Sequence, residues 1–140
     1  MIILDTNVLS ALMIEPAAIQ VATWLNEQPR ESMWTTSITV LEIHVGLETM
    51  AGGRRRDSRL RSFRRLIEEK LEQRIAAFDH DAAEATAMLM AARSRAGTPR
   101  DLRDTMIAGI AVARRAAVAT RNVRHFSDAG IDVINPWNEV

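Results

Sequence analysis

The chain has 140 residues, of which 47% are apolar and 26% charged, and its formal net charge at pH 7 is zero. This length and composition are typical of one ordinary globular domain, which we expect to span residues 1–140. The absence of cysteine excludes disulfide bonds, thiolate metal sites and a cysteine nucleophile. The first residues, MIILDTNV, have neither the basic region of a signal peptide nor the length of a membrane span, so we expect a cytoplasmic protein with no membrane partner.

Apolar periodicity predicts strands that alternate with helices along the whole chain. The predicted strands are 2–4, 33–36, 75–78, 117–120 and 131–134, and the predicted helices are 17–28, 37–50, 54–74, 82–96 and a last one from 101 or 102 to about 116. In the second of these helices we expect Ser37 at the cap. Ile38, Leu41 and Val45 are expected along one side of it. The alternation predicts βαβ units, and therefore an α/β fold with a mostly parallel sheet and helices on both faces.

Polar side chains follow several of the predicted strands at their carboxyl ends. Asp5 comes directly after the first strand, and segment 120–122, Thr-Arg-Asn, leaves a late strand. Glu42 lies in the second turn of the helix after the second strand, and Asp104 lies in the first turn of the last predicted helix. Because ligands of an open parallel sheet bind beyond the carboxyl ends of its strands, we expect these groups to meet at one edge.

Each of these groups also has a purely structural interpretation. Asp5 could cap the helix that follows it, and Asp101 with Asp104 resembles a capping box at a helix start. Glu42 could be an ordinary surface residue, and Asn122 an ordinary turn residue. The local patterns alone leave both interpretations open.

Three carboxylates that converge on one point favour a bound cation. Two carboxylates about 4 Å apart repel by roughly 4 kcal/mol at an effective dielectric constant near 20, so a third would be costly without a compensating ion. Oxygen ligands, without cysteine or a histidine pair, favour Mg²⁺ or Mn²⁺ over zinc. Such an ion would activate a water molecule and neutralise charge on a phosphate during an in-line displacement.

Four segments of the chain, MIILDTNVLSAL, SITVLEIHVGL, GTPRDLRDTMIAGIA and VATRNVRHF, together with the late INPW, closely resemble the PIN-domain toxins of the VapC family. The nearest resemblance is to its FitB-like branch. The segments follow the order and spacing of the family over essentially the whole chain. This resemblance implies a Rossmann-like PIN domain and a Mg²⁺- or Mn²⁺-dependent endoribonuclease that is the toxin of a bacterial type II toxin–antitoxin system.

The same resemblance implies roles for individual residues. Carried onto this sequence, the metal-binding and catalytic acids are Asp5, Glu42 and Asp104, with Asp5 and Asp104 as the principal ligands. Glu42 would help to hold the ion or orient the attacking water. Asn7 and Thr120 match positions that shape the same pocket. The implied partners are an RNA substrate, a second copy of the chain in a homodimer, and a VapB- or FitA-like antitoxin whose tail covers the active-site groove.

One position departs from the FitB-like pattern, which has aspartate where this chain has Asn122. Many VapC-like sequences also read TRNV here, and they often carry an acid at the position of His125. The fourth carboxylate of the family is then missing, which leaves open whether one or two metal ions bind. Asp101 is a candidate replacement because it is close to Asp104 along the same helix.

Basic residues are concentrated between residues 54 and 65, where seven arginines accompany one acid. A charge run of this kind is either the exposed face of an amphipathic helix or a guide for an RNA backbone. Arg121 and Arg124 are nearer candidates for RNA binding because they flank Asn122.

Two other classes of protein that place aspartate after a first strand are disfavoured. A phosphatase of the haloacid-dehalogenase type needs a second aspartate where this chain has Asn7. A response-regulator receiver needs paired acids near the first strand and a lysine after a late strand, whereas the sole lysine, Lys70, lies in the arginine-rich helix. The remaining alternative is a PIN fold with weak or no activity that binds RNA or protein, and Asn122 is the change that favours it.

Overall fold

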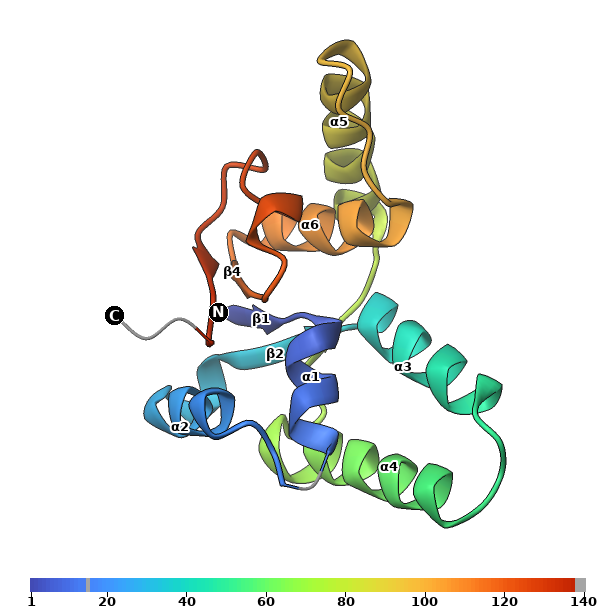
Figure 1. Ribbon diagram of the computed structural model, residues 1–140. Helices are drawn as coiled ribbons and strands as arrows, with labels where there is room; N and C mark the ends of the chain where they lie inside the picture. The colour runs from blue at the N-terminus through green and yellow to red at the C-terminus, as the bar shows by residue number, and fades with distance from the viewer. Residues whose placement is uncertain (15, 138–140) are drawn as a thin grey trace.

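Five short strands form one parallel sheet in the computed structural model, which describes residues 1–14 and 16–137 (Figure 1). In chain order they are β1 (Ile2–Leu4), β2 (Met33–Thr36), β3 (Ile75–Ala76), β4 (Ala117–Ala119) and β5 (Val133–Ile134). Their order across the sheet is β3-β2-β1-β4-β5, with every neighbouring pair parallel. Because β1 pairs with β2 on one side and β4 on the other, the residue after β1 leaves the middle of the sheet.

Helices cover both faces of this sheet, as the sequence predicts (Figure 1). They are α1 (Thr6–Met13), α2 (Ile19–Glu27), α3 (Ser37–Thr49), α4 (Arg54–Arg65), α5 (His80–Arg95) and α6 (Leu102–Arg114). Successive residues of β1 point to opposite faces. Leu4 belongs to a buried cluster with Val8 of α1, and Ile3 belongs to a second cluster with Ile107 of α6. None of the helices in the described part of the chain is long and apolar enough to cross a membrane.

The cap of α3 differs from the prediction. Thr36 is the capping residue, since its Oγ1 accepts a hydrogen bond from the Thr39 backbone N–H at 3.0 Å. The predicted cap, Ser37, instead accepts a hydrogen bond from the Phe78 backbone N–H at 3.1 Å, which ties the start of α3 to the loop after β3. Thr36 and Ser37 both carry a hydroxyl that could cap α3, so the local sequence does not decide between them. Because the Ser37 hydroxyl bonds to the Phe78 backbone, Thr36 is the residue that caps the helix.

The buried side of α3 also differs in part from the prediction. Ile38 is buried, but Leu41 and Val45 are 51% and 45% exposed. The core contacts of this helix come from Ile43 and Leu47, which have the same spacing of four residues. The sequence contains two apolar stripes on α3, and periodicity alone does not determine which one faces the sheet.

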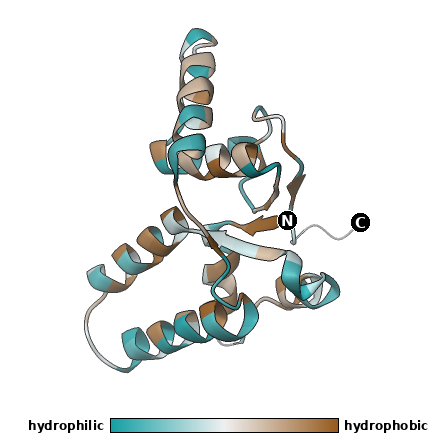
Figure 2. Cartoon of the chain, turned by 180° about the vertical axis from the view of Figure 1, so that it is seen from behind, coloured by the Kyte–Doolittle hydropathy of each residue, from teal (hydrophilic) through white to brown (hydrophobic). Residues whose placement is uncertain are grey.

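The arginine-rich helix ends earlier than predicted. After α4 the chain continues through one π-helical segment, Leu66–Lys70, and then Glu72 and Gln73 take left-handed backbone conformations that lead into β3. Phe63, Ile67 and Leu71, which follow one another at spacings of four residues, are buried. The arginines of α4 lie mostly on the exposed side, and Figure 2 shows this hydrophilic face, so α4 is amphipathic.

Helices α5 and α6 pack closely at Gly109, and α5 projects beyond the sheet (Figure 1). A Cβ atom at Gly109 would lie 1.9 Å from Thr86 Oγ1 and 2.9 Å from the Ala82 carbonyl oxygen. The Ala82 contact is with backbone, so a side-chain rotation cannot relieve it. Glycine is therefore required here by the close approach of the two helices.

We predict opposite effects of alanine at two helical glycines. Gly109→Ala should lower the free energy of unfolding by about 1–3 kcal/mol because it overpacks the α5–α6 contact. Gly46→Ala on α3 is the matched control, since a Cβ there meets nothing within 4 Å. It should raise the free energy of unfolding by about 0.5–1 kcal/mol through helix propensity. Urea denaturation measures both, and equal effects of the two substitutions would contradict the proposed packing constraint.

Candidate active site

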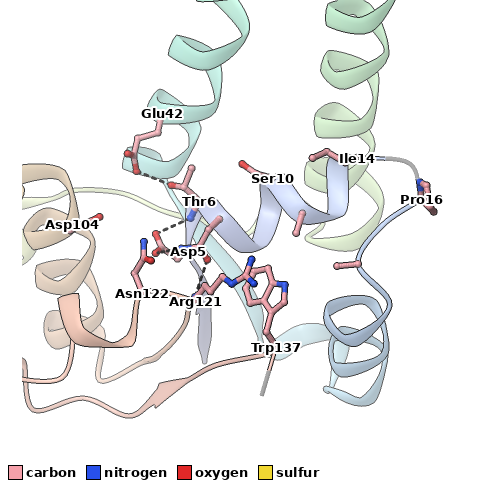
Figure 3. A pocket seen from close by; sticks show the side chains of 13 residues that line it. Asp5, Thr6, Ser10, Ile14, Pro16, Glu42, Asp104, Arg121, Asn122 and Trp137 are labelled. Carbon is pink, nitrogen blue, oxygen red and sulfur yellow. Dashed lines mark hydrogen bonds between the residues drawn. The ribbon is translucent and has the colours of Figure 1, made fainter. Parts of the chain in front are cut away.

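Asp5 is buried at the junction between the central strand and α1, with 3% of its surface exposed. Its Oδ1 accepts a hydrogen bond from the Thr6 backbone N–H at 2.8 Å, which caps α1. Its Oδ2 accepts hydrogen bonds from Thr120 Oγ1 at 2.8 Å and from Asn7 Nδ2 at 3.3 Å. The capping interpretation of Asp5 is therefore correct, and the same carboxylate also lines the cleft described below (Figure 3).

The environment of Asp5 disfavours its ionised form. Burial raises its pKa from 3.8 to about 6, and the negative charges of Asp104 and Glu42 act in the same direction. The hydrogen bonds from Thr120 and from the Thr6 backbone oppose this shift but do not cancel it. A nearby cation would therefore stabilise the ionised form of Asp5.

Glu42 reaches the same place from α3. Its Oε1 accepts a hydrogen bond from Thr6 Oγ1 at 2.7 Å, and its Oε2 lies 3.8 Å from Arg103 Nε. Thr6 Oγ1 also lies 3.3 Å from Thr39 Oγ1, so the threonine after Asp5 connects α1 to α3. These contacts orient Glu42 toward the start of α1 and not toward bulk solvent.

Asp104 lies in the first turn of α6 and contacts His125. Asp104 Oδ2 is 2.7 Å from His125 Nδ1, which lies on the short 3₁₀ segment Val123–His125 after β4. Asp101 is the N-cap of α6, and its Oδ1 accepts hydrogen bonds from the backbone N–H groups of Arg103 and Asp104. Asp101 does not line the cleft, so its position supports a capping role and not the role of a fourth acid.

A cleft of about 700 Å³ brings these residues together (Figure 3). Its lining consists of Asp5, Thr6, Asn7, Ser10, Ala11, Ile14, Pro16, Ala18, Glu42, Asp104, Arg121, Asn122 and Trp137. The three carboxylates come from three different elements, namely the end of β1, α3 and α6. Thr120 does not line the cleft, but its hydroxyl donates a hydrogen bond to Asp5, which does. Arg124 is exposed and also lies outside the lining.

Asn7 and Arg121 also line the cleft. Asn7 Nδ2 donates to both Asp5 and Thr120 Oγ1, and Asn7 Oδ1 accepts the Arg121 backbone N–H at 3.1 Å. The Arg121 guanidinium lies over the Trp137 ring, 4.9 Å from its centroid. Asn7 thus connects the end of β1 to the end of β4, and Arg121 brings a cation to the edge of the cleft.

The donor chemistry of the cleft fits a hard divalent cation, because the converging ligands are carboxylate oxygens. Within residues 1–14 and 16–137, however, no three Asp, Glu or His side chains are close enough to share an ion as they stand. Each carboxylate instead makes contacts with the protein, Asp5 with Thr120, Glu42 with Thr6, and Asp104 with His125. An ion would have to compete with these contacts and draw the acids together.

Comparison with known proteins establishes the family. The sequence model of the PIN domain matches residues 2–131. The chain belongs to the PIN-domain family. This PIN-domain chain is 38% identical over 137 residues to the VapC ribonuclease Y4jK of Sinorhizobium fredii, and the match covers 98% of each protein. It is 36% identical over 137 residues to the plasmid stability protein StbB of Pseudomonas syringae pv. tomato, covering 98% of this chain and 99% of StbB.

A solved structure shows the same fold over the full chain. The structure of FitAB bound to a DNA fragment superposes with a TM-score of 0.89 at 28% identity, covering 100% of this chain and 98% of that chain. The resemblance to VapC and FitB proteins that the sequence motifs predict is therefore confirmed. The roles of the individual acids remain predictions of the motif and of the geometry.

Several residues at the site were not predicted from the sequence. Thr6, which positions Glu42, lies within the LDTNV segment and could have been singled out as a hydroxyl next to the first acid. Trp137 carries no signal in the sequence, and it lines the cleft next to the Arg121 guanidinium. Arg103 carries no local signal, because its contact with Glu42 depends on how α3 and α6 meet.

We predict that Asp5→Asn stabilises the metal-free protein at pH 7.5. A pKa raised from 3.8 to about 6 means that the fold favours protonated Asp5, so its contribution to stability is present below pH 4 and is lost as the pH rises through about 6. The loss corresponds to about 3 kcal/mol. A mismatch of the new amide with the Asn7 amide should offset part of this, leaving a net gain of about 1–2 kcal/mol.

Urea denaturation in EDTA at pH 7.5 and pH 4 measures this effect. The gain should disappear at pH 4, where Asp5 is protonated in the wild-type protein. Equal destabilisation by Asp5→Asn at both pH values would show that hydrogen bonding by Asp5 outweighs the cost of its buried charge.

Proposed function

We propose that this chain is a Mg²⁺- or Mn²⁺-dependent endoribonuclease, the toxin of a bacterial type II toxin–antitoxin pair. The observation that carries the proposal is that Asp5, Glu42 and Asp104 line one cleft from three separate elements, with the pKa of Asp5 raised by burial and by the other two acids. The name of the VapC ribonuclease relative supports the same conclusion. A buried carboxyl in a cleft whose pKa is raised by burial and by neighbouring acids is typical of a functional site.

Each residue of the cleft has a distinct role in this proposal. Asp5 and Asp104 would hold the ion, which when bound supplies activation of water and neutralisation of phosphate charge. Glu42, held by Thr6, would accept a hydrogen bond from the attacking water and so orient it. Asn7 and Thr120 fix Oδ2 of Asp5.

Arginine side chains would bring the RNA backbone to this acidic cleft. Arg121 is the best placed, because it lines the cleft and its guanidinium rests on Trp137. Arg124 is exposed on the same segment but lies outside the lining, so it would contact the backbone beyond the cleft. The near-zero net charge makes such local cations necessary, since the molecule as a whole does not attract RNA.

The proposed partners follow from the same relatives and from exposed apolar side chains. A relative that is 29% identical to this chain is named toxin FitB, and we propose a VapB- or FitA-like antitoxin as the partner of this chain. We also propose a homodimer. Exposed apolar residues on α3 and α5, namely Leu41, Val45, Met88 and Met90, are available for such contacts.

A catalytically inactive PIN fold that binds RNA or protein is the second candidate. Two observations favour it, since Asn122 lines the cleft where the family pattern has an acid, and His125 contacts Asp104. The experiment below separates the two candidates.

We predict metal-dependent cleavage of total bacterial RNA by the purified, antitoxin-free protein. Cleavage should occur with Mg²⁺ or Mn²⁺ and stop in EDTA. Asp104→Asn should reduce the rate by more than about 100-fold, because even residues behind the metal ligands contribute 10–100-fold in metal sites. Gel analysis of the RNA measures the rate.

Asp101→Asn is the matched control for this experiment. It lies three residues before Asp104 on the same helix start, outside the cleft, and asparagine caps helices as well as aspartate does. It should cleave at the wild-type rate. Cleavage by Asp104→Asn at the wild-type rate would refute the site, and no cleavage by the wild-type protein under any condition would favour the binding module.

A further inference from the structure

Three hollows on the surface adjoin one another along α1. The acidic cleft at the start of this helix shares Ser10 and Ile14 with a second hollow between α1, α3 and α4. The second hollow shares Met13, Ile14 and Arg59 with a third one, between the end of α1 and the start of α4. Figure 3 shows Ser10 and Ile14 one after the other along α1. We call the second and third hollows together the α1 groove, and it continues from the acidic cleft to α4.

The groove follows the length of α1. A helix rises about 1.5 Å per residue, so Ile14 at the end of α1 lies about 13 Å from Asp5 along the helix axis. Helix α4 packs against α1, which places residues of its first turns at this far end. A few nucleotides of single-stranded RNA can span such a distance.

Two of the seven arginines between residues 54 and 65 line the far end of the groove. Arg55 and Arg59 line the third hollow together with Ser58, and Arg59 also lines the second. The other five arginines line none of the three hollows. The arginine run therefore presents two different surfaces, one of them directed to the groove.

The guanidinium groups of Arg55 and Arg59 are not neutralised by a carboxylate. Among residues 1–14 and 16–137, Arg56 pairs with Glu48 at 3.0 Å, whereas no ion pair includes Arg55 or Arg59. Arg59 Nη1 contacts Met50 Sδ at 3.8 Å, and Met50 lines the second hollow, so this contact holds Arg59 at the groove. Both guanidinium groups are available to bind phosphate oxygens.

Charge is distributed unevenly along this surface. Of the described residues that line the α1 groove, Glu42 is the only acid, and it stands at the end next to the acidic cleft. The floor between Glu42 and the two arginines is largely apolar, with Ile43 and Leu47 among its residues. No carboxylate of the described lining therefore repels a polyanion between the acidic cleft and α4.

We propose that the RNA strand extends from the acidic cleft along α1 and that Arg55 and Arg59 bind its phosphates at the far end. The inference rests on the proposed function, since it concerns the RNA substrate of the same cleft. The described lining of the α1 groove contains no aromatic side chain on which a base could stack. The contact is therefore electrostatic and tolerant of sequence, and it compensates for the repulsion between RNA and the acids.

The direct test is the salt dependence of RNA binding by the purified full chain in EDTA, followed by fluorescence anisotropy of a labelled single strand of about 12 nucleotides. The double substitution Arg55→Gln and Arg59→Gln should weaken binding by about tenfold at low salt. The slope of log K against log salt concentration should fall by about 1.4, because each phosphate contact of a single strand contributes about 0.7. The same variant should raise KM for RNA cleavage in Mg²⁺ or Mn²⁺.

The matched control is the double substitution Arg61→Gln and Arg64→Gln. Both residues are exposed on the same helix and line none of the three hollows, and the change in net charge is the same. This control should leave the slope unchanged. Arg55→Gln alone removes an exposed side chain, so it tests the groove without the Met50 contact of Arg59. Arg55→Lys with Arg59→Lys should retain most of the slope, and circular dichroism checks that each variant is folded.

The outcomes separate this inference from the proposed ribonuclease. Equal effects of the two double substitutions on the slope would overturn the groove, since only general charge would then matter. Unchanged RNA binding and KM after substitution of Arg55 and Arg59 would also overturn it and leave the nuclease standing, with the groove open to a protein partner instead. RNA binding that depends on Arg55 and Arg59, without cleavage under any metal condition, would support the groove and overturn the nuclease.

Discussion

Asp5 is buried where the central strand β1 meets α1, and its carboxylate accepts three hydrogen bonds there. These contacts connect two parts of the chain that are distant in sequence, because Thr120 follows β4 and Asn7 links to Arg121. The Asp5 carboxylate holds this edge of the sheet together through its hydrogen bonds, but burial disfavours its negative charge. The fold therefore fixes the position of the Asp5 carboxylate, while its ionised form would be stabilised by a cation.

The parallel topology explains why the acids converge. Since β1 lies between β2 and β4, the segments after these three strands start at the same edge of the sheet. The segment after β2 is α3, which carries Glu42, and the segment after β4 carries Asn122 and His125. Asp104 reaches the same edge from the start of α6, the helix that precedes β4.

The sequence was sufficient where local patterns determine the structure. Short apolar runs identify the strands, and the positions of Asp5 after a strand, Asp104 in the first turn of a helix and Glu42 in the second turn of another predict that they meet at one edge. The sequence was insufficient where two local patterns are equivalent and only tertiary contacts determine which one is buried. Ile43 and Leu47 have the same spacing as Leu41 and Val45, and only packing against the sheet selects the first pair. The approach of His125 to Asp104 likewise depends on Arg93, a residue whose burial no local pattern indicates.

The Arg93–Asp128 contact has a consequence for the divergence of related chains. Loss of Asp128 alone would leave the buried guanidinium of Arg93 without its carboxylate partner, which destabilises the fold. Loss of Arg93 alone would release Thr105 and the His125 carbonyl oxygen together. Neither position can therefore change by single steps without a penalty, and we expect them to co-vary in relatives of this chain, so that the pair is either kept or replaced as a unit.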